Sequence, residues 1–186
     1  MSSDLRAALR RFKPDKHRTQ LTPRARGELV SVTDISLSGR PALVPDTNIY
    51  IMAAAGTLPE AARLLLERSL LFHCSVCLSE LTTGVANYDP ARPDWRRVRD
   101  HYTALFDTIP DSRILIPDDQ AWIDAGVIAG SLSRIQNFHK NQRKECLNDA
   151  LIYLTAAKAG LSVLTGNTAD FDLIQQVAPG GRFIHL

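Results

Sequence analysis

The sequence has few cysteines and no long apolar run, and each absence excludes a class of protein. Three cysteines in 186 residues do not make the disulfide framework of a small secreted domain. No stretch reaches the roughly 18–20 apolar residues that cross a bilayer. The first residues, Met-Ser-Ser-Asp-Leu-Arg, lack the apolar core of a secretory signal. We therefore expect a reduced, cytoplasmic protein with no membrane-bound part.

Charge is almost balanced over the whole chain but is uneven along it. The net charge is +2, and 45% of the residues are hydrophobic, which is enough for one ordinary globular domain. Residues 1–40 hold nine Lys or Arg and four acids, whereas the remaining 146 residues carry a net charge of −3. Such a basic segment is either a contact for nucleic acid or another anion, or a solvated tail. We predict a basic N-terminal extension over 1–40 and a folded domain over 41–186.

Strand and helix patterns alternate, which predicts an α/β fold with a central, mostly parallel β-sheet flanked by α-helices. Short apolar runs typical of buried parallel strands occupy residues 42–45, 70–74, 113–117, 161–165 and 182–186. A β-branched run at 29–35 predicts a strand within the extension. The expected helices lie near 48–55, 59–70, 75–87, 92–108, 119–132, 148–159 and 171–177. The polar stretch 136–146 predicts a loop, with Asn148 capping the helix that follows.

Four acidic residues stand where a ligand site is expected. Asp46 follows the first domain strand and Asp170 lies shortly after the strand at 161–165, and ligands gather at the carboxyl ends of parallel strands. Glu80 and Asp149 lie within otherwise apolar helical segments, where a carboxylate is costly to bury unless it is paired or binds metal. No Lys or Arg lies within one helical turn of Asp46 or Glu80. A hard divalent cation, Mg²⁺ or Mn²⁺, is the simplest counter-ion.

The segments around these acids also resemble a known family. They read Asp46-Thr47-Asn48, Glu80-Leu-Thr-Thr-Gly84, Asp149-Ala-Leu-Ile152 and Thr165-Gly-Asn167-Thr-Ala-Asp170-Phe171. In this order they resemble the motifs of the PIN-domain ribonucleases, in particular the VapC-type toxins of type II toxin–antitoxin systems. The resemblance covers about residues 42–186. The extension 1–40 departs from the compact toxins, which start close to the first strand.

The resemblance implies a PIN-like nuclease domain over 41–186 with metal-dependent endoribonuclease activity. It implies that the catalytic and metal-binding residues are Asp46, Glu80, Asp149 and Asp170, holding Mg²⁺ or Mn²⁺. It assigns supporting roles to Thr47, Asn48 and Asn167, with Asp172 as a spare acid. It further implies a homodimer and a small antitoxin protein that covers the acidic site with an Arg or Lys.

A basic stretch precedes Asp149 and is expected to contact the phosphates of an RNA substrate. The residues assigned to this contact are Arg134, Lys140, Arg143 and Lys144. Phe138 is placed to stack on an unpaired base. The competing interpretation of the stretch is an ordinary solvated loop.

Two other functions compete with the nuclease. An Asp-nucleophile phosphatase would use Asp46, but such enzymes want a second Asp two positions on, where this chain has Asn48. A non-catalytic RNA-binding PIN module would gain nothing from an acidic cluster without metal. The Cys74-Ser-Val-Cys77 pair has the spacing of a zinc or redox motif, but we interpret it as packing at a strand-to-helix junction.

Overall fold

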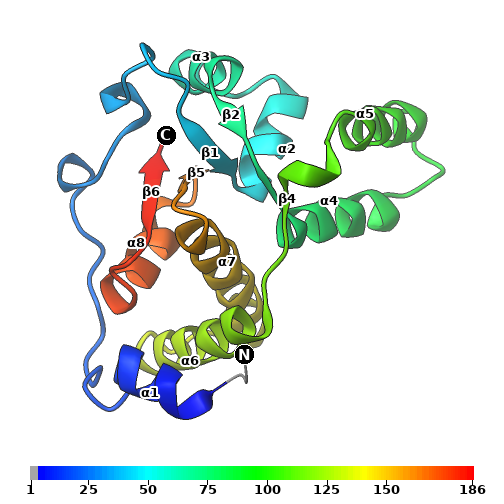
Figure 1. The fold of residues 1–186 in the computed structure, drawn as a ribbon. Helices are drawn as coiled ribbons and strands as arrows, with labels where there is room; N and C mark the ends of the chain where they lie inside the picture. Colours follow the sequence, from blue (N-terminus) through cyan, green and yellow to red (C-terminus); the bar gives the residue numbers. More distant parts are fainter. Residues whose placement is uncertain (1–3) are drawn as a thin grey trace.

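The computed structural model describes residues 4–186 and centres on a small parallel sheet (Figure 1). Four strands lie in the order β2 (Leu70–Leu71), β1 (Ala42–Pro45), β5 (Ser162–Thr165) and β6 (Arg182–His185), and every neighbouring pair is parallel. A second parallel pair joins β3 (His73–Cys74) to β4 (Ile114–Leu115). The predicted α/β class with a parallel central sheet is confirmed.

Helices connect the strands and supply most of the structure. They are α1 (Leu5–Phe12), α2 (Thr47–Ala55), α3 (Glu60–Arg68), α4 (Ser75–Asn87), α5 (Trp95–Asp107), α6 (Asp119–Ile135), α7 (Lys140–Lys158) and α8 (Thr168–Val177). Short 3₁₀ turns cover Arg26–Glu28, Val32–Asp34 and Asp111–Arg113. Helix starts follow local chemistry: the Asp118 carboxylate accepts from the Ala121 N–H at 2.9 Å and caps α6.

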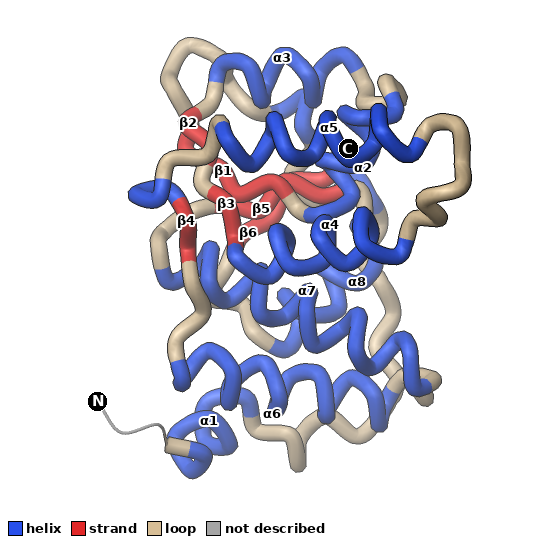
Figure 2. The backbone as a smooth tube through the Cα atoms, turned by 90° about the vertical axis from the view of Figure 1, so that its right-hand side faces the viewer, coloured by secondary structure: helices blue, strands red, loops and turns tan. Residues whose placement is uncertain are grey.

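The sheet separates two apolar layers, because successive strand residues point to opposite faces. Val44, Val163 and Phe183 join the larger cluster, which α6, α7 and α8 complete. Leu164 and Ile184 face the other way and pack with residues of α2 and α3. Figure 2 shows α3 on one side of the strands and α7 and α8 on the other, with α6 and α1 beyond them. No single helix in residues 4–186 is long and apolar enough to cross a membrane; α2 and α3 pass that test only as a pair bent by 113°.

Two expected strands differ from the prediction. The apolar run 70–74 is divided at Phe72 into β2 and β3, which pair in different sheets, so each half follows its own partner strand. The prediction of a strand over residues 29–35 is wrong. It forms the 3₁₀ turn Val32–Asp34, and only Ser31 bridges to His185 of β6. The Ser31 hydroxyl and Asp34 carboxylate cap this turn, and local bonds of that kind compete with strand pairing.

The loop expected over 136–146 is mostly helix. The chain turns at Gln136–His139, where Asn137 has a left-handed φ of 55°, and α7 begins at Lys140. The His139 N–H donates to Gln142 Oε1 at 2.8 Å and fixes this start. Lys, Gln, Arg and Glu are good helix formers, so the stretch continues the helix rather than interrupting it. Asn148 therefore lies inside α7 and is not its cap.

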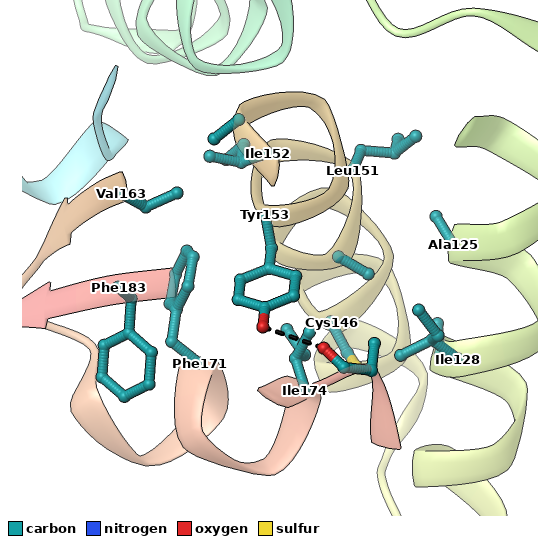
Figure 3. Packing of buried hydrophobic residues seen from close by; sticks show 14 of the residues in the cluster. Ala125, Ile128, Cys146, Leu151, Ile152, Tyr153, Val163, Phe171, Ile174 and Phe183 are labelled. Atoms are coloured by element: carbon teal, nitrogen blue, oxygen red, sulfur yellow. Dashed lines mark hydrogen bonds between the residues drawn. The ribbon is translucent and has the colours of Figure 1, made fainter. Parts of the chain in front are cut away.

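Tyr153 of α7 joins that helix to the loop before β6. Its hydroxyl donates to the Ala178 carbonyl at 2.9 Å, a bond drawn in Figure 3, and accepts from the Gly181 N–H at 3.1 Å. A Cβ built on Gly181 would stand 2.5 Å from the ring of Tyr153, closer than atoms pack. The loop therefore needs a glycine at this position.

We predict that Gly181→Ala destabilises the protein by about 1–3 kcal/mol, the usual cost of overpacking a filled site. The matched control is Gly180→Ala, because a Cβ there meets nothing within 4 Å. Chemical unfolding of both variants measures the difference. Equal stability of the two would contradict the packing seen around Tyr153.

Candidate functional site

The structure brings the four predicted acids together at the carboxyl ends of β1 and β5. Asp46 directly follows β1, and Glu80, Asp149 and Asp170 come from α4, α7 and α8. The charges of Asp46, Asp170 and Glu80 all act on Asp149. Four segments that are far apart in the sequence thus place carboxylates at one edge of the sheet. Their convergence is observed, whereas their role as metal ligands stays a prediction.

Asp46 is buried and held by neighbours from α2 and β5. Its carboxylate accepts from the Thr47 N–H at 2.7 Å, from the Thr165 hydroxyl at 2.7 Å and from the Asn48 amide. Only 3% of the residue is exposed. Burial raises the pKa of Asp46 to about 6, and the nearby Glu80 charge adds to the rise, while these hydrogen bonds lower the pKa in part. The side chain is therefore poised to lose its proton near neutral pH.

Asp149 is also buried and lies among the same charges. Burial raises the pKa of Asp149 well above its usual range, and the charges of Asp46, Asp170, Glu80 and Glu145 raise it further. No ion pair within residues 4–186 involves any of the four converging acids. No Lys, Arg or His side chain in the described residues therefore forms an ion pair that would offset the mutual repulsion of these carboxylates.

Neutral donors bind the carboxylates and link them to one another. The Asn167 amide donates to Asp149 Oδ2 at 3.1 Å and to Asp170 Oδ2 at 2.8 Å, and thereby bridges α7 and α8. Glu80 accepts from the Thr47 hydroxyl and, at 2.7 Å, from the Asn148 amide. Thr47, Asn48 and Asn167 therefore all contact the acids, in the places that the sequence assigned to supporting residues.

Sequence reasoning missed two members of this network. Thr165 donates to Asp46, and it already stood in the last of the four motifs. Asn148 donates to Glu80, but its position before an apolar helical run made it resemble a helix cap. The signal for Asn148 was its place beside Asp149 in a segment that is otherwise apolar.

The donor set suits a hard divalent cation, because the side chains offer carboxylate, hydroxyl and amide oxygens around uncompensated buried charge. Among the described residues, however, no three His, Cys, Asp or Glu side chains are grouped as ligands of one ion. The carboxylate oxygens accept hydrogen bonds from amides and hydroxyls instead. The chemistry of the site fits Mg²⁺ or Mn²⁺, and the side chains would have to close up around the ion.

Asp172 does not join the acids as the spare that the sequence suggested. It is fully buried, and its carboxylate is bound by Arg24 and by Gln176. Asp170 and Asp172 are two residues apart in α8, and a helix turns about 200° over that interval. The two side chains therefore point to different sides of the helix.

The four basic residues assigned to RNA fall into two groups. The Arg134 guanidinium donates to the carbonyls of Pro14 and His17, and Arg143 lines with it a groove of about 440 Å³ between α6 and α7. Lys140 and Lys144 are exposed and lie two turns and one turn before Asn148, which places them on the helix stripe that reaches Glu80. Their role in RNA binding stays a prediction.

The cysteines form no site of their own in the part of the chain that the structure describes. Cys74, Cys77 and Cys146 are buried and free. The Cys77 thiol lies 3.7 Å from the Pro45 carbonyl, directly beneath the backbone that presents Asp46. Packing at the junction between β3 and α4 accounts for the pair, as the sequence suggested.

Comparison with solved structures identifies the fold. Matches include the VapBC2 complex of Rickettsia felis bound to a DNA fragment from their promoter, with TM-score 0.56 and 18% identity, covering 78% of this chain and 98% of that chain. DNA-bound VapBC from Salmonella typhimurium gives 0.55 and 25%, with the same shares covered. FitAcB from Neisseria gonorrhoeae gives 0.54 and 18%, covering 77% and 96%. The chain has a PIN-like fold.

The more specific prediction, a VapC-type toxin, is wrong as stated. No protein-family model matches the chain, and neither does any curated protein. The matching structures are VapBC and FitAB complexes of toxin with antitoxin, and the likeness does not distinguish a VapC-like from a VapB-like chain. Short motifs on a PIN-like fold thus do not assign this chain to one component of such a pair.

We predict that Asp149→Asn stabilises the protein at pH 8 in the presence of a chelator. The folded-state pKa of Asp149 is raised above its ordinary value of 3.8, so this carboxyl group makes the fold less stable as the pH rises above that value, whereas a neutral amide does not. Its oxygen can still accept from Asn167. We expect the melting temperature to rise by about 3 °C or more, which is ~1 kcal/mol for a chain of this size.

The stability of the protein depends on pH because the pKa values of both buried acids are raised. Asp46 stabilises the fold fully only below its ordinary pKa of 3.8, and this contribution is lost as the pH rises through about 6. Near pH 4 both buried acids are protonated, so Asp149→Asn should show no gain there. A variant that melts below the unmodified protein at pH 8 would contradict a crowded acidic site.

Proposed function

We propose that the protein is an endoribonuclease that depends on Mg²⁺ or Mn²⁺ and works in a toxin–antitoxin context. The observation that carries the proposal is the convergence of Asp46, Glu80, Asp149 and Asp170 without a protein counter-ion. Such a site is costly unless a cation occupies it during the working cycle. The PIN-like fold supports the same activity class.

Each group of residues has a defined part in this proposal. The four acids would hold the cation, which when bound would lower the pKa of a water molecule and stabilise charge on the phosphate. Asn167 keeps α7 and α8 in register by bridging Asp149 and Asp170. Thr47 and Asn148 orient Glu80 in the same way. Hydrolysis by water leaves a 5′-phosphate and a 3′-hydroxyl on the RNA.

A protein partner and a second copy complete the proposal. The VapBC and FitAB structures are complexes, which supports a small antitoxin as partner for this chain. A groove of about 510 Å³ between α2, α4 and α5 has Glu80 in its wall, with Leu81, Val85 and the half-exposed Ile51 beside it. In this proposal an apolar segment of the antitoxin occupies the groove and places an Arg or Lys beside Glu80. The homodimer expected from the sequence remains part of the proposal.

We predict that the purified protein cleaves single-stranded RNA only with Mg²⁺ or Mn²⁺, and that Asp46→Asn reduces the rate by at least about 100-fold. Losing a group that stabilises transition-state charge has an effect of this size. The control is Asp107→Asn, an exposed acid in the last turn of α5 that should leave cleavage unchanged. A panel of RNAs with analysis of the cleaved ends measures the activity.

Other outcomes of that assay identify the competing functions. Hydrolysis of small phosphate esters without RNA cleavage would indicate an Asp-nucleophile phosphatase, although Asn48 occupies the position of its second acid and is bonded to Asp46. RNA binding without turnover at any metal concentration would indicate a non-catalytic module. Either result would overturn the nuclease proposal.

We predict that Lys140→Gln with Lys144→Gln weakens RNA binding at fixed salt and makes it less salt-dependent. For single-stranded RNA, the slope of log affinity against log salt falls by about 0.7 for each phosphate that a Lys no longer neutralises. Filter binding with chelator present isolates affinity from cleavage. Arg96→Gln with Arg99→Gln serves as control and removes the same number of charges, since both residues are exposed on α5. An equal decrease in both variants would mean that only net charge matters.

A further inference from the structure

Residues 13–31, which we call the strap, cross the molecule from α1 to the edge of the sheet. Figure 1 shows this blue segment running from α1 past α8 and β6. At one end α1 packs on α6 through Ala8 and Phe12, both buried in the larger core cluster. At the other end the Val30 carbonyl accepts from the His185 N–H at 3.0 Å, beside the Ser31–His185 bridge. The strap thus pairs with the carboxyl end of β6, the edge strand of the sheet.

Side chains of the folded body hold the strap by its backbone. Arg134 donates to the carbonyls of Pro14 and His17, at 2.7 and 3.1 Å. The Gln136 amide donates to the Leu21 carbonyl at 2.9 Å, and the Gln176 amide donates to the Thr22 carbonyl at 3.0 Å. These repeated contacts to main-chain carbonyls fix the path of the segment. A solvated tail would not make such contacts.

One strap side chain reaches into the body. Arg24 donates from its backbone N–H to Asp172 Oδ2 at 2.8 Å, from Nε to Asp172 Oδ1 at 2.6 Å, and from Nη2 to Gln175 at 2.5 Å. The Asp172 side chain is fully buried, and Arg24 is the basic residue that pairs with it. A buried carboxylate depends strongly on such a partner, so this contact holds α8 against the strap.

The clamped helix also carries part of the acidic site. Asp170 lies in the first turn of α8 and Asn167 immediately precedes that helix. Asn167 bonds both Asp170 and Asp149, so a shift of α8 alters the spacing of these two carboxylates directly. Helix α8 is therefore bonded on one side to Arg24, through Asp172, and carries part of the acidic site on another side, through Asp170.

We propose that Arg24 is a positioning residue for the acidic site, acting through Asp172 and α8. The inference rests on the proposed function for its catalytic consequence, but not for its structural one. The matches to the VapBC structures cover 98% of those chains and 78% of this one. A part of this chain about as long as residues 1–40 therefore has no counterpart in them. The contact between Arg24 and Asp172 gives the basic extension a role within the molecule.

The test uses the double variant Arg24→Gln with Asp172→Asn in the full chain. Removing both charges avoids a lone buried carboxylate, so the protein should fold. The control is Arg26→Gln, two residues along the strap, whose exposed guanidinium makes no hydrogen bond or ion pair within the described chain. Mn²⁺ affinity by titration calorimetry, hydrogen exchange of the metal-free protein and RNA cleavage are measured for each.

We expect the double variant to bind Mn²⁺ about tenfold more weakly, as happens when residues that support metal ligands are removed. Amides in the first turn of α8 should exchange faster, and kcat should fall while the KM for RNA stays unchanged. Arg26→Gln should match the unmodified protein in every measurement. Unaltered Mn²⁺ affinity and exchange in a folded double variant would overturn the positioning role.

The result also separates this inference from the nuclease proposal. If the unmodified protein cleaves no RNA, the nuclease proposal fails, and Mn²⁺ affinity and α8 exchange still decide the role of Arg24. If it cleaves RNA and the double variant cleaves and binds Mn²⁺ equally well, the nuclease stands and the positioning role fails. A decrease in Mn²⁺ affinity of the same size in Arg26→Gln would mean that the effect comes from the positive charge of the strap, and it would overturn the positioning role of Arg24.

Discussion

Repulsion among buried carboxylates is the constraint on which the arrangement of this molecule depends. Parallel strands bring Asp46 and the segment Thr165–Asp170 to one edge of the sheet, and α4 and α7 add Glu80 and Asp149. Burial removes the solvent that would screen these charges, so the pKa values of Asp46 and Asp149 rise. A fold optimised for stability alone would have placed apolar residues or a Lys at these positions.

The protein limits this cost with neutral donors rather than with cations. The donors are side chains without charge, and Asn167 bonds two of the acids whereas each of the others bonds one: Thr47, Asn48, Asn148, Thr165 and Asn167. An amide or hydroxyl stabilises a carboxylate without cancelling its charge, so the site keeps its attraction for a metal ion. A Lys or Arg in the same place would neutralise the acids permanently. The choice of donors is therefore itself an argument for an exchangeable cation.

The sequence allowed the sheet and the acids to be predicted because both are encoded locally. Each buried strand is a short apolar run, and Asp46 and Asp170 follow such runs in a fixed order. The path of residues 13–31 could not be predicted, because its contacts join residues more than 100 positions apart, such as Arg24 with Asp172. Asn148 was misread for a related reason, since its role depends on α7 beginning at Lys140 rather than eight residues later. The division of residues 70–74 between two sheets likewise depends on partner strands.

The strap changes how the acidic site is to be understood. On a PIN-like domain alone, α8 would be held by the core through Phe171 and Ile174, which face inward. Here the outward side of the same helix is also fixed, by Arg24 on the buried Asp172. Buried ion pairs add little net stability compared with apolar packing, but they impose a strict geometry, because the charge must meet its partner. A helix that carries Asp170 and adjoins Asn167 is a place where geometry matters more than stability. Arg24 thus ties the basic extension to the helix that carries Asp170.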